Sequence, residues 1–408
     1  MRPLSRSKYA RLFLFALAGY LPALCTAPAA HADDTGKVMV DVRYRAEYVD
    51  QENLDATAAA STIRLRLGYQ TPSYRNAYVF AEMEDIRALG NDEYNSTANG
   101  RGALPVVVDP EDTELNQAFV AWANGGSSFK IGKQRFTLDN HRFFGNVGWR
   151  QNEQTLDGLA VNLALPAGVG GKLTYAHWIR ANRIFGAHHP SEASARAELF
   201  ADVLHYARPV GGGAIAVYAH LIDLVDAGAA SHANFGLRGS YDHAVSHGKV
   251  AVTAEIAQQN EYRLASEVSR SYYAMLDLGA TLHGVGVHAA TEVLSGNGEY
   301  AFQTPFATLH AFNGWSDRFL STPANGLVDA YGTIAIPIEK AKLVLVYHEF
   351  YAEQTSAHYG REWGAALSRA IFGPVSGMLK YSQYEADEFS VDIYKVWGSI
   401  GVKFSRDA

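Results

Sequence analysis

The chain has 408 residues, 48% of them hydrophobic, and its 35 Lys and Arg are outnumbered by 42 Asp and Glu, which gives a formal charge of −7. A nucleic-acid partner is therefore not expected, because proteins that bind nucleic acids carry a clear excess of basic residues. Beyond residue 32, no run approaches the ~18 consecutive apolar residues that a membrane-spanning helix needs.

Residues 1–32 have the organisation of a Sec-type signal peptide. Four basic residues precede an apolar run over 12–24, and Ala30-His31-Ala32 forms a small-x-small cleavage site. Cleavage after Ala32 would remove Cys25, the only cysteine, so no disulfide is expected in the mature chain. It would leave 31 Lys and Arg against 42 Asp and Glu, a formal charge of −11. We expect residues 33–408 to form a single exported domain.

Residues 37–48, KVMVDVRYRAEY, alternate with period two. Val38, Val40 and Val42 fall on one face, and charged residues such as Asp41 and Arg43 fall on the other, as in a β-strand with one apolar and one polar side. The same pattern recurs along the chain in segments of about ten residues, the length that a tilted strand needs to cross a bilayer. The sequence therefore predicts an all-β, transmembrane antiparallel β-barrel.

Alternation marks eighteen strands, and clusters of Gly, Pro, Asn and Asp mark the breaks between them. The predicted strands are 37–48, 61–70, 76–86, 113–123, 128–135, 155–165, 171–180, 198–207, 213–223, 231–241, 249–259, 271–282, 285–294, 326–336, 341–351, 359–370, 376–385 and 392–404. An even number suits a closed barrel with both termini in the periplasm. Tyrosine and tryptophan near the strand ends, on the apolar side, predict an aromatic girdle: Tyr48, Tyr69, Trp122, Tyr206, Tyr241 and Tyr272.

The predicted connections alternate in length. Long ones, such as 87–112, 136–154 and 295–325, are followed by short ones, such as 71–75 and 337–340. A barrel that inserts from one side of a membrane has this property, with short periplasmic turns and longer external loops.

Eighteen strands enclose an aqueous lumen. The side of each strand that carries the charged residues must face this lumen. A basic side chain turned toward mid-bilayer lipid would cost roughly 2–4 kcal/mol. The residues predicted to line the pore are Arg43, Arg45, Arg64, Arg66, Glu82, Glu84, Lys130, Arg238, Glu255 and Glu292. Two interpretations remain open: the four arginines form a basic wall that favours anions, or these charges pair across the wall and stiffen it.

The loop over 295–325 is the longest predicted connection and is rich in aromatic residues, too many for a segment lying free in water. We expect it to fold against the wall or into the mouth and to constrict the pore, with an ordered external cap as the alternative. The candidate constriction residues are Phe302, Phe306, His310, Phe312 and Trp315.

No catalytic, metal or cofactor site is predicted. The chain has no GxSxG or Walker A motif, and His348-Glu349 lacks the second histidine of a zinc-binding HExxH motif. A Ser/His or Asp/His pair at the barrel rim would still permit an enzyme, so that class remains an alternative.

Seven short stretches go beyond a generic barrel pattern. Leu115-Asn116-Gln117-Ala118-Phe119 leads to Ile131-Gly132-Lys133-Gln134-Arg135, then to Gly148-Trp149-Arg150-Gln151 and Thr155-Leu156-Asp157-Gly158. Glu292-Val293-Leu294-Ser295-Gly296, Phe302-Gln303-Thr304-Pro305 and 308–315 follow. This order resembles the alginate-export family of Gram-negative outer-membrane porins, from about residue 40 to the C-terminus. The resemblance implies an eighteen-stranded barrel that carries solutes across the outer membrane and, in the family's namesake, secretion of an acidic polysaccharide through a basic pore.

We therefore expect an outer-membrane channel for passive transport of polar or anionic solutes, with an acidic polysaccharide or oligosaccharide among the candidates. A general porin for small nutrients is the first alternative, and a rim enzyme or surface adhesin is the second. The expected partners are outer-membrane lipid, the solute and the barrel assembly machinery, because the last strand ends on an alternating face that closes at Phe404.

Overall fold

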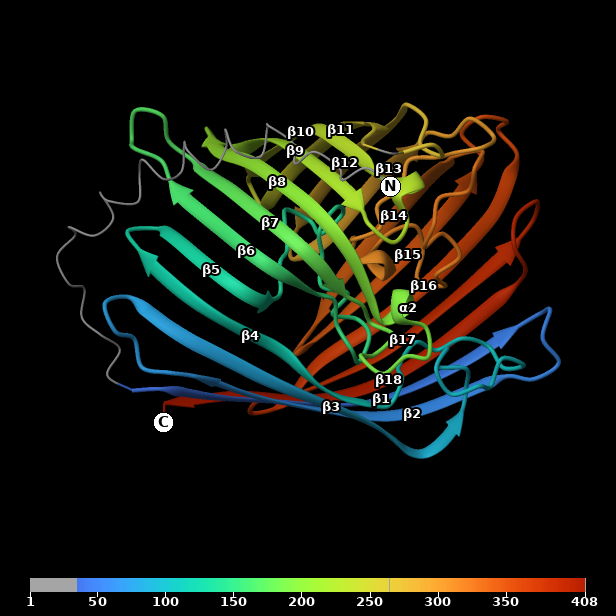
Figure 1. Ribbon diagram of the computed structural model, residues 1–408. Helices are drawn as coiled ribbons and strands as arrows, with labels where there is room; N and C mark the ends of the chain where they lie inside the picture. Colours follow the sequence, from blue (N-terminus) through green and yellow to red (C-terminus); the bar gives the residue numbers. More distant parts are fainter. Residues whose placement is uncertain (1–34, 264, 408) are drawn as a thin grey trace, which may run out of the picture.

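The computed structural model describes residues 35–263 and 265–407, which fold into eighteen antiparallel strands (Figure 1). The signal-peptide prediction for residues 1–32 lies outside the described residues. The strands are β1 (Lys37–Gln51), β2 (Ala58–Gln70), β3 (Ala77–Glu93), β4 (Asp112–Asn124), β5 (Ser127–Gln134), β6 (Thr155–Ala164), β7 (Lys172–Asn182), β8 (Arg196–Val210), β9 (Gly213–Leu224), β10 (His232–Val245), β11 (Gly248–Glu261), β12 (Ser271–Leu282), β13 (Val285–Leu294), β14 (Leu327–Ile338), β15 (Ala341–Tyr351), β16 (His358–Phe372), β17 (Val375–Ala386) and β18 (Ile393–Asp407). Every predicted strand is confirmed; β3 and β8 extend several residues beyond their predicted ends.

The sheet closes on itself. Each strand pairs with the next along the chain, and β1 pairs with β18 from Lys37↔Asp407 to Gln51↔Ile393. Closure leaves no strand edge with unpaired backbone groups, as a spanning sheet in lipid requires. The predicted barrel is confirmed.

The connections differ between the two ends of the barrel. At one end, at the left of Figure 1, none of the turns exceeds seven residues. At the opposite end the connections reach 32 residues, over 295–326. We call these the short-turn end and the long-loop end. The predicted alternation is confirmed for the longest connections, 94–111, 135–154 and 295–326, whereas 52–57, 352–357 and 387–392 at the long-loop end have only six residues each.

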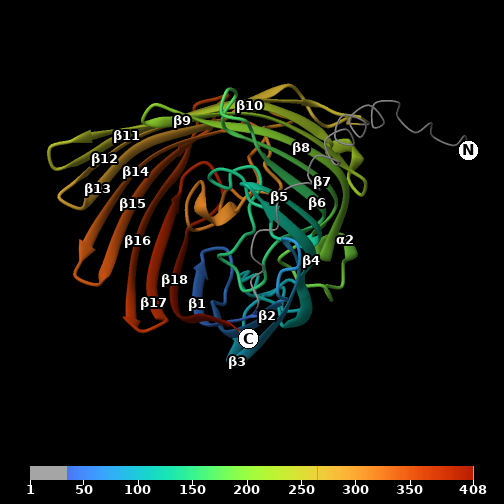
Figure 2. The ribbon, with the colours of Figure 1, turned by 90° about the vertical axis from the view of Figure 1, so that its left-hand side faces the viewer.

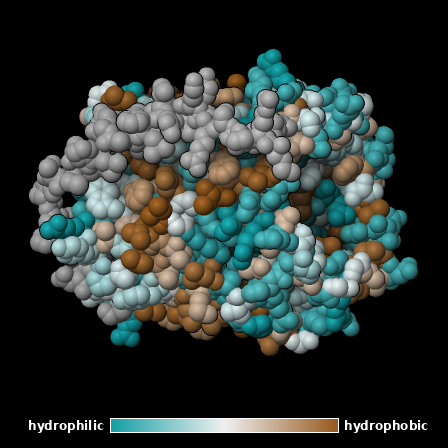
Figure 3. Space-filling view, in the orientation of Figure 1, coloured by the Kyte–Doolittle hydropathy of each residue, from teal (hydrophilic) through white to brown (hydrophobic). Residues whose placement is uncertain are grey.

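The two faces of the wall follow the period-two pattern. On β2, Leu65 and Leu67 are exposed on the outside, whereas Arg64 and Arg66 are buried in the interior. In the space-filling view, brown apolar side chains gather over the strands at the left, and teal hydrophilic ones predominate toward the right, at the long-loop end (Figure 3). No helix in the described part of the chain is long and apolar enough to cross a membrane.

Two of the long connections lie inside the barrel. Figure 2 looks in from the short-turn end and shows the teal segment after β5 and the orange segment after β13 within the ring of strands. They span 135–154 and 295–326, and the second contains the single-turn helix η3 (Leu309–Ala311). The main hydrophobic cluster lies between these segments and the wall, and it includes Phe143, Phe144, Phe302 and Phe306.

Candidate functional site

Four arginines lie close together on the inner face of β1 and β2. The β1–β2 register places Arg43 directly opposite Arg64 and Asp41 opposite Arg66, with Arg45 one inward position further along β1. Like charges directly opposite each other on a sheet are destabilising. The cluster formed by Arg43, Arg45, Arg64 and Arg66, the arginine cluster, therefore needs acceptors from elsewhere in the chain.

Residues 148–151 of the first inserted segment provide these acceptors. Arg43 donates to the Gly148 carbonyl at 3.0 Å and to the Arg150 carbonyl, and Arg45 donates to the Trp149 carbonyl. The Gln151 carbonyl accepts from both Arg64 and Arg66 at 3.3 Å. Four consecutive backbone carbonyls thus turn toward the guanidinium groups. Such charge-assisted hydrogen bonds are roughly twice as strong as neutral ones.

Carboxylates compensate three of the four arginines. Arg45 pairs with Glu47 and Arg64 with Asp41, both at 2.8 Å, and Arg66 pairs with Glu84. Arg43 has no carboxylate partner within residues 35–263 and 265–407; its remaining hydrogen bond goes to Gln151 Oε1 at 2.9 Å. Arg43 thus keeps a positive charge that carbonyl and amide oxygens stabilise without neutralising.

The two inserted segments are bonded to each other. Gly145 N donates to the Phe306 carbonyl at 2.8 Å, and Thr308 N donates to the His141 carbonyl at 3.0 Å. The rings of Phe144 and Phe306 stack, with an interplanar angle of 8°. A Cβ at Gly145 would come within 2.7 Å of Thr308, so this close approach requires glycine. Together the segments form one body inside the lumen.

Asp317 joins this body to the wall. Its carboxylate accepts from Arg150 of the first segment at 3.0 Å, from Lys395 of β18 at 2.9 Å and from His310 at 2.7 Å. All four side chains are almost fully buried. The attraction of three donors holds the pKa of Asp317 well below its usual value despite burial, which opposes ionisation.

His310 connects Asp317 to Lys380 of β17. Lys380 Nζ lies 2.8 Å from His310 Nε2, so a neutral imidazole accepts there and donates from Nδ1 to Asp317. The Lys380 ammonium also lies 3.8 Å from the Trp315 ring centre and 4.3 Å from that of Trp149. Burial, followed by the charge of Lys380, lowers the pKa of His310 to about 3.

The other residues predicted to line the pore are distributed around the wall. Arg238 pairs with Glu255 at 2.5 Å, and Glu82 accepts from Arg135 at 2.6 Å. Glu292 pairs with Arg142 of the first inserted segment at 2.8 Å, which is a further tie between segment and wall. Lys130 lies apart from these groups, over the ring of Phe119.

The candidate constriction residues lie inside the barrel, but they differ in exposure. Phe302, Phe306 and His310 are buried in the packing between segment and wall. Phe312 lies against the Arg142 guanidinium, and the Trp315 amide donates to Glu362 of β16. These contacts place the second segment in the interior of the barrel.

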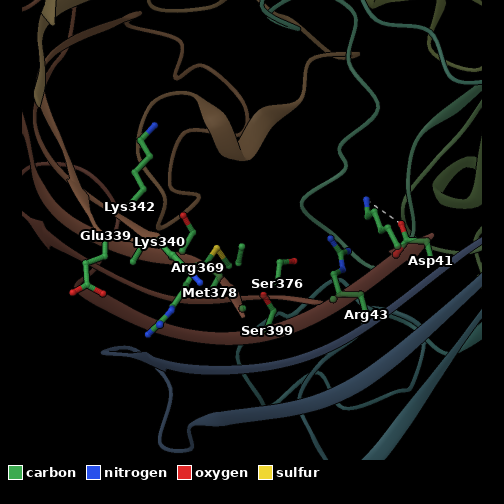
Figure 4. Close-up of a pocket in the computed structure, with 15 residues that line it drawn as sticks. Asp41, Arg43, Glu339, Lys340, Lys342, Arg369, Ser376, Met378 and Ser399 are labelled. Atoms are coloured by element: carbon green, nitrogen blue, oxygen red, sulfur yellow. Dashed lines mark ion pairs between the residues drawn. The ribbon is translucent and has the colours of Figure 1, made fainter. Parts of the chain in front are cut away.

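A polar vestibule opens between the inserted segments and the short-turn end. Two cavities, of about 550 and 480 Å³, share Asp41, Arg43 and Lys403. Figure 4 shows Lys342 pointing into this space, whereas Glu339 and Arg369 point away from it. Apart from Glu339, Lys340 and Arg369 at the rim, six basic and three acidic side chains line the two cavities. The basic ones are Arg43, Arg64, Arg66, Arg135, Lys342 and Lys403, and the acidic ones are Asp41, Glu82 and Glu153.

Sequence reasoning missed five charged residues that organise this site: Arg142, Arg150, Asp317, Lys380 and Lys395. The two lysines could have been predicted from the sequence, because period-two alternation on β17 and β18 places them on the inward side of the wall. The other three lie in loops, where no periodicity predicts direction. Among the described residues, no group of three or more potential ligands could hold a metal ion.

Comparison with known proteins gives one family and one fold. The family model described as alginate export matches residues 36–264. Crystal structures of similar fold include Pseudomonas aeruginosa OpdK with vanillate, at TM-score 0.71 and 11% identity, covering 91% of this chain and 99% of that one. Acinetobacter baumannii OccAB4 has TM-score 0.71 and 9% identity, covering 91% and 98%. No curated protein matches the chain.

Removing the charge of Asp317 should release the inserted segments. Asp317→Asn leaves the buried Arg150 and Lys395 without their shared carboxylate, and breaking a buried ion pair costs about 3–5 kcal/mol. Urea unfolding of the detergent-solubilised barrel measures this loss. Asp242→Asn is the control, because its pair with Lys249 is about half exposed, 53% for each side chain, and should change stability by less than about 0.5 kcal/mol. Equal losses in both variants would contradict the buried role of Asp317.

The titration of His310 should make the barrel less stable in acid. The folded protein keeps His310 neutral down to about pH 3, whereas the unfolded chain takes up a proton near pH 6.5. The stability contributed by His310 is therefore fully present above pH 6.5 and declines as pH falls toward 3. The imidazole of His310 stacks on the Trp149 ring, with centroids 4.2 Å apart. His310→Phe retains an aromatic ring there but cannot titrate. Its unfolding midpoint should fall less between pH 7 and pH 4.5 than that of the unaltered protein; equal declines would refute the assignment.

Proposed function

This chain belongs to the alginate-export family, and from that premise we propose that it is a passive outer-membrane channel selective for small anionic solutes. Its fold is that of the outer-membrane porins. The specificity is our proposal, and one observation carries it: the basic surplus of the vestibule, with the uncompensated charge of Arg43 at its inner end.

The local charge opposes the charge of the whole chain. The protein is acidic overall, at −7, whereas six basic and three acidic side chains line the vestibule. Counting Glu84, the buried partner of Arg66, the basic surplus is two, and Arg43 and Lys342 are the two lining cations without an ion pair among the described residues. In a narrow passage, the charges within a Debye length of the ion, about 8 Å at physiological ionic strength, determine which ions enter. An anion entering from the short-turn end meets Lys342 and Lys403 before it reaches Arg43.

The inserted segments support a limit on solute size. They are fixed to the wall through Arg142, Arg150 and Asp317, all nearly buried, so widening the lumen requires breaking ion pairs that water does not screen. We propose that residues 302–315 form a constriction that admits small carboxylates and short acidic oligosaccharides. OpdK, which shares the fold, was crystallised with vanillate, a small carboxylate, so this class of solute is a suitable first test.

A general porin for small nutrients is the second candidate. The pairing of Arg45, Arg64 and Arg66 with carboxylates favours it, because neutralised charges discriminate little between solutes. We propose no catalytic activity, and no contact described above favours a rim enzyme or an adhesin.

Two proposals concern biogenesis. We propose that residues 1–32 direct export as a cleaved signal peptide. We also propose that β18 is recognised by the barrel assembly machinery, because its outward face presents an exposed apolar row that includes Val396, Ile400 and Phe404.

Neutralising the vestibule should shift ion selectivity. In the triple variant Arg43→Gln, Lys342→Gln and Lys403→Gln, the cation-to-anion permeability ratio should rise several-fold, because the local potential falls. Reversal potentials of single channels in planar bilayers under a KCl gradient measure this ratio.

The matched control neutralises three exposed arginines that line neither cavity: Arg87→Gln, Arg101→Gln and Arg361→Gln. It changes net charge equally and should leave the ratio unchanged. Equal shifts in the two variants would mean that total charge governs selectivity, and no shift in either would favour the general porin.

A further inference from the structure

Gly401 leaves a notch in the inner wall of the vestibule. The register places it between Arg43 of β1 and Ser376 of β17, so these three residues form one inward row across β1, β18 and β17. Neighbouring strands lie about 4.8 Å apart, which separates the Cα atoms of Arg43 and Ser376 by roughly 10 Å. Apart from its chain neighbours, a Cβ at Gly401 would meet no atom nearer than Ser376 Oγ, at 3.6 Å. Open space therefore separates the arginine from the serine.

Basic and hydroxyl side chains surround this notch. Ser399 and Lys403 lie two residues on either side of Gly401 along β18, and hence on the same inward face. Together with Arg43 and Ser376 they line the first cavity of the vestibule. Figure 4 shows Ser376 and Ser399 beside Arg43. We call Arg43, Ser376, Ser399, Gly401 and Lys403 the Gly401 notch.

Several donors of the Gly401 notch have no acceptor. A guanidinium carries five N–H groups, and the bonds of Arg43 to residues 148–151 use three of them. The other two have no acceptor in the described part of the chain. Within residues 35–263 and 265–407, the hydroxyls of Ser376 and Ser399 also have no hydrogen-bond partner. The notch therefore offers positive charge and unused donors to a molecule in the vestibule.

The surroundings of Arg43 differ from those of the other three arginines of the cluster, each of which pairs with a carboxylate of β1 or β3. The cross-strand neighbours of Arg43 are Arg64 and Gly401, and neither can supply a carboxylate. Asp41, two residues away along β1, pairs with Arg64 at 2.8 Å and with Lys403 at 3.0 Å. The wall thus leaves the place of a carboxylate beside Arg43 unfilled.

We propose that the Gly401 notch is a binding subsite for one carboxylate group of the solute, which takes the unfilled place beside Arg43. Its oxygens can accept from the two unused N–H groups of Arg43 and from the hydroxyls of Ser376 and Ser399, and such charge-assisted bonds are strong. Chloride is a single acceptor centre and cannot match the planar fork of a guanidinium, so the subsite favours carboxylates over chloride. This inference rests on the proposed function and adds to it where the solute is held.

The acetate-to-chloride permeability ratio tests the subsite separately from a general preference for anions. Reversal potentials in planar bilayers, with potassium acetate on one side and potassium chloride on the other, measure this ratio. Gly401→Asp places a carboxylate of the wall in the notch, so the ratio should fall several-fold. Ser405→Asp is the matched control, because it adds the same charge to the inward face of β18, in the second cavity, and leaves the notch open. Its ratio should equal that of the unaltered chain.

Heat-modifiable migration in gels shows whether each variant barrel is folded. Should Gly401→Asp not fold, Ser376→Ala provides the second test: it removes one donor, keeps the notch open, and should also lower the acetate-to-chloride ratio. An unchanged ratio in the folded Gly401→Asp barrel, or an equal fall in Ser405→Asp, would overturn the subsite. Reversal potentials under a KCl gradient judge the proposed function separately. An unaltered chain without anion preference there would overturn both, whereas anion preference with an unchanged ratio in Gly401→Asp would overturn the subsite alone.

Discussion

The contact between the arginine cluster and residues 148–151 determines much of the interior of this barrel. Arg43 and Arg64 face each other across β1 and β2, and such a pair needs acceptors within reach. Four consecutive carbonyls of the first inserted segment meet this need. The same segment sends Arg150 to Asp317, which fixes the second segment to the wall. The position of each segment therefore depends on charges that the wall carries.

This arrangement links stability to transport. The carboxylates that neutralise Arg45, Arg64 and Arg66 stabilise the wall, and they also remove most of its local potential. Arg43 differs, because its partners are carbonyl and amide oxygens. It remains charged at the boundary between the inserted segments and the vestibule. A channel built in this way can hold its segments rigidly and still present a basic passage to an anion.

The strands and their two faces could be predicted because alternation is visible within a few neighbouring residues. On β2, for example, Leu65 and Arg66 are adjacent in sequence and lie on opposite faces of the wall. The positions of the inserted segments could not. Arg43 and Gln151 are 108 residues apart, and nothing near residue 151 indicates which wall it approaches. The aromatic content of 295–325 correctly predicted that this loop packs against the barrel and does not lie free in water. The first segment, 135–154, has aromatic residues at a similar density, Phe136, Phe143, Phe144 and Trp149, so the same signal was present there, but its place in the lumen was missed.

The account rests on the claim that the two inserted segments set the width of the channel. The most direct measurement is the single-channel conductance of a variant lacking residues 301–320, with the flanking glycines kept and folding verified by heat-modifiable migration. Removing this stretch takes away η3, Asp317 and the partners of Lys380. The account predicts a clear rise in conductance and noisier current, because the first segment loses its partner. An unchanged conductance in a correctly folded barrel would contradict it.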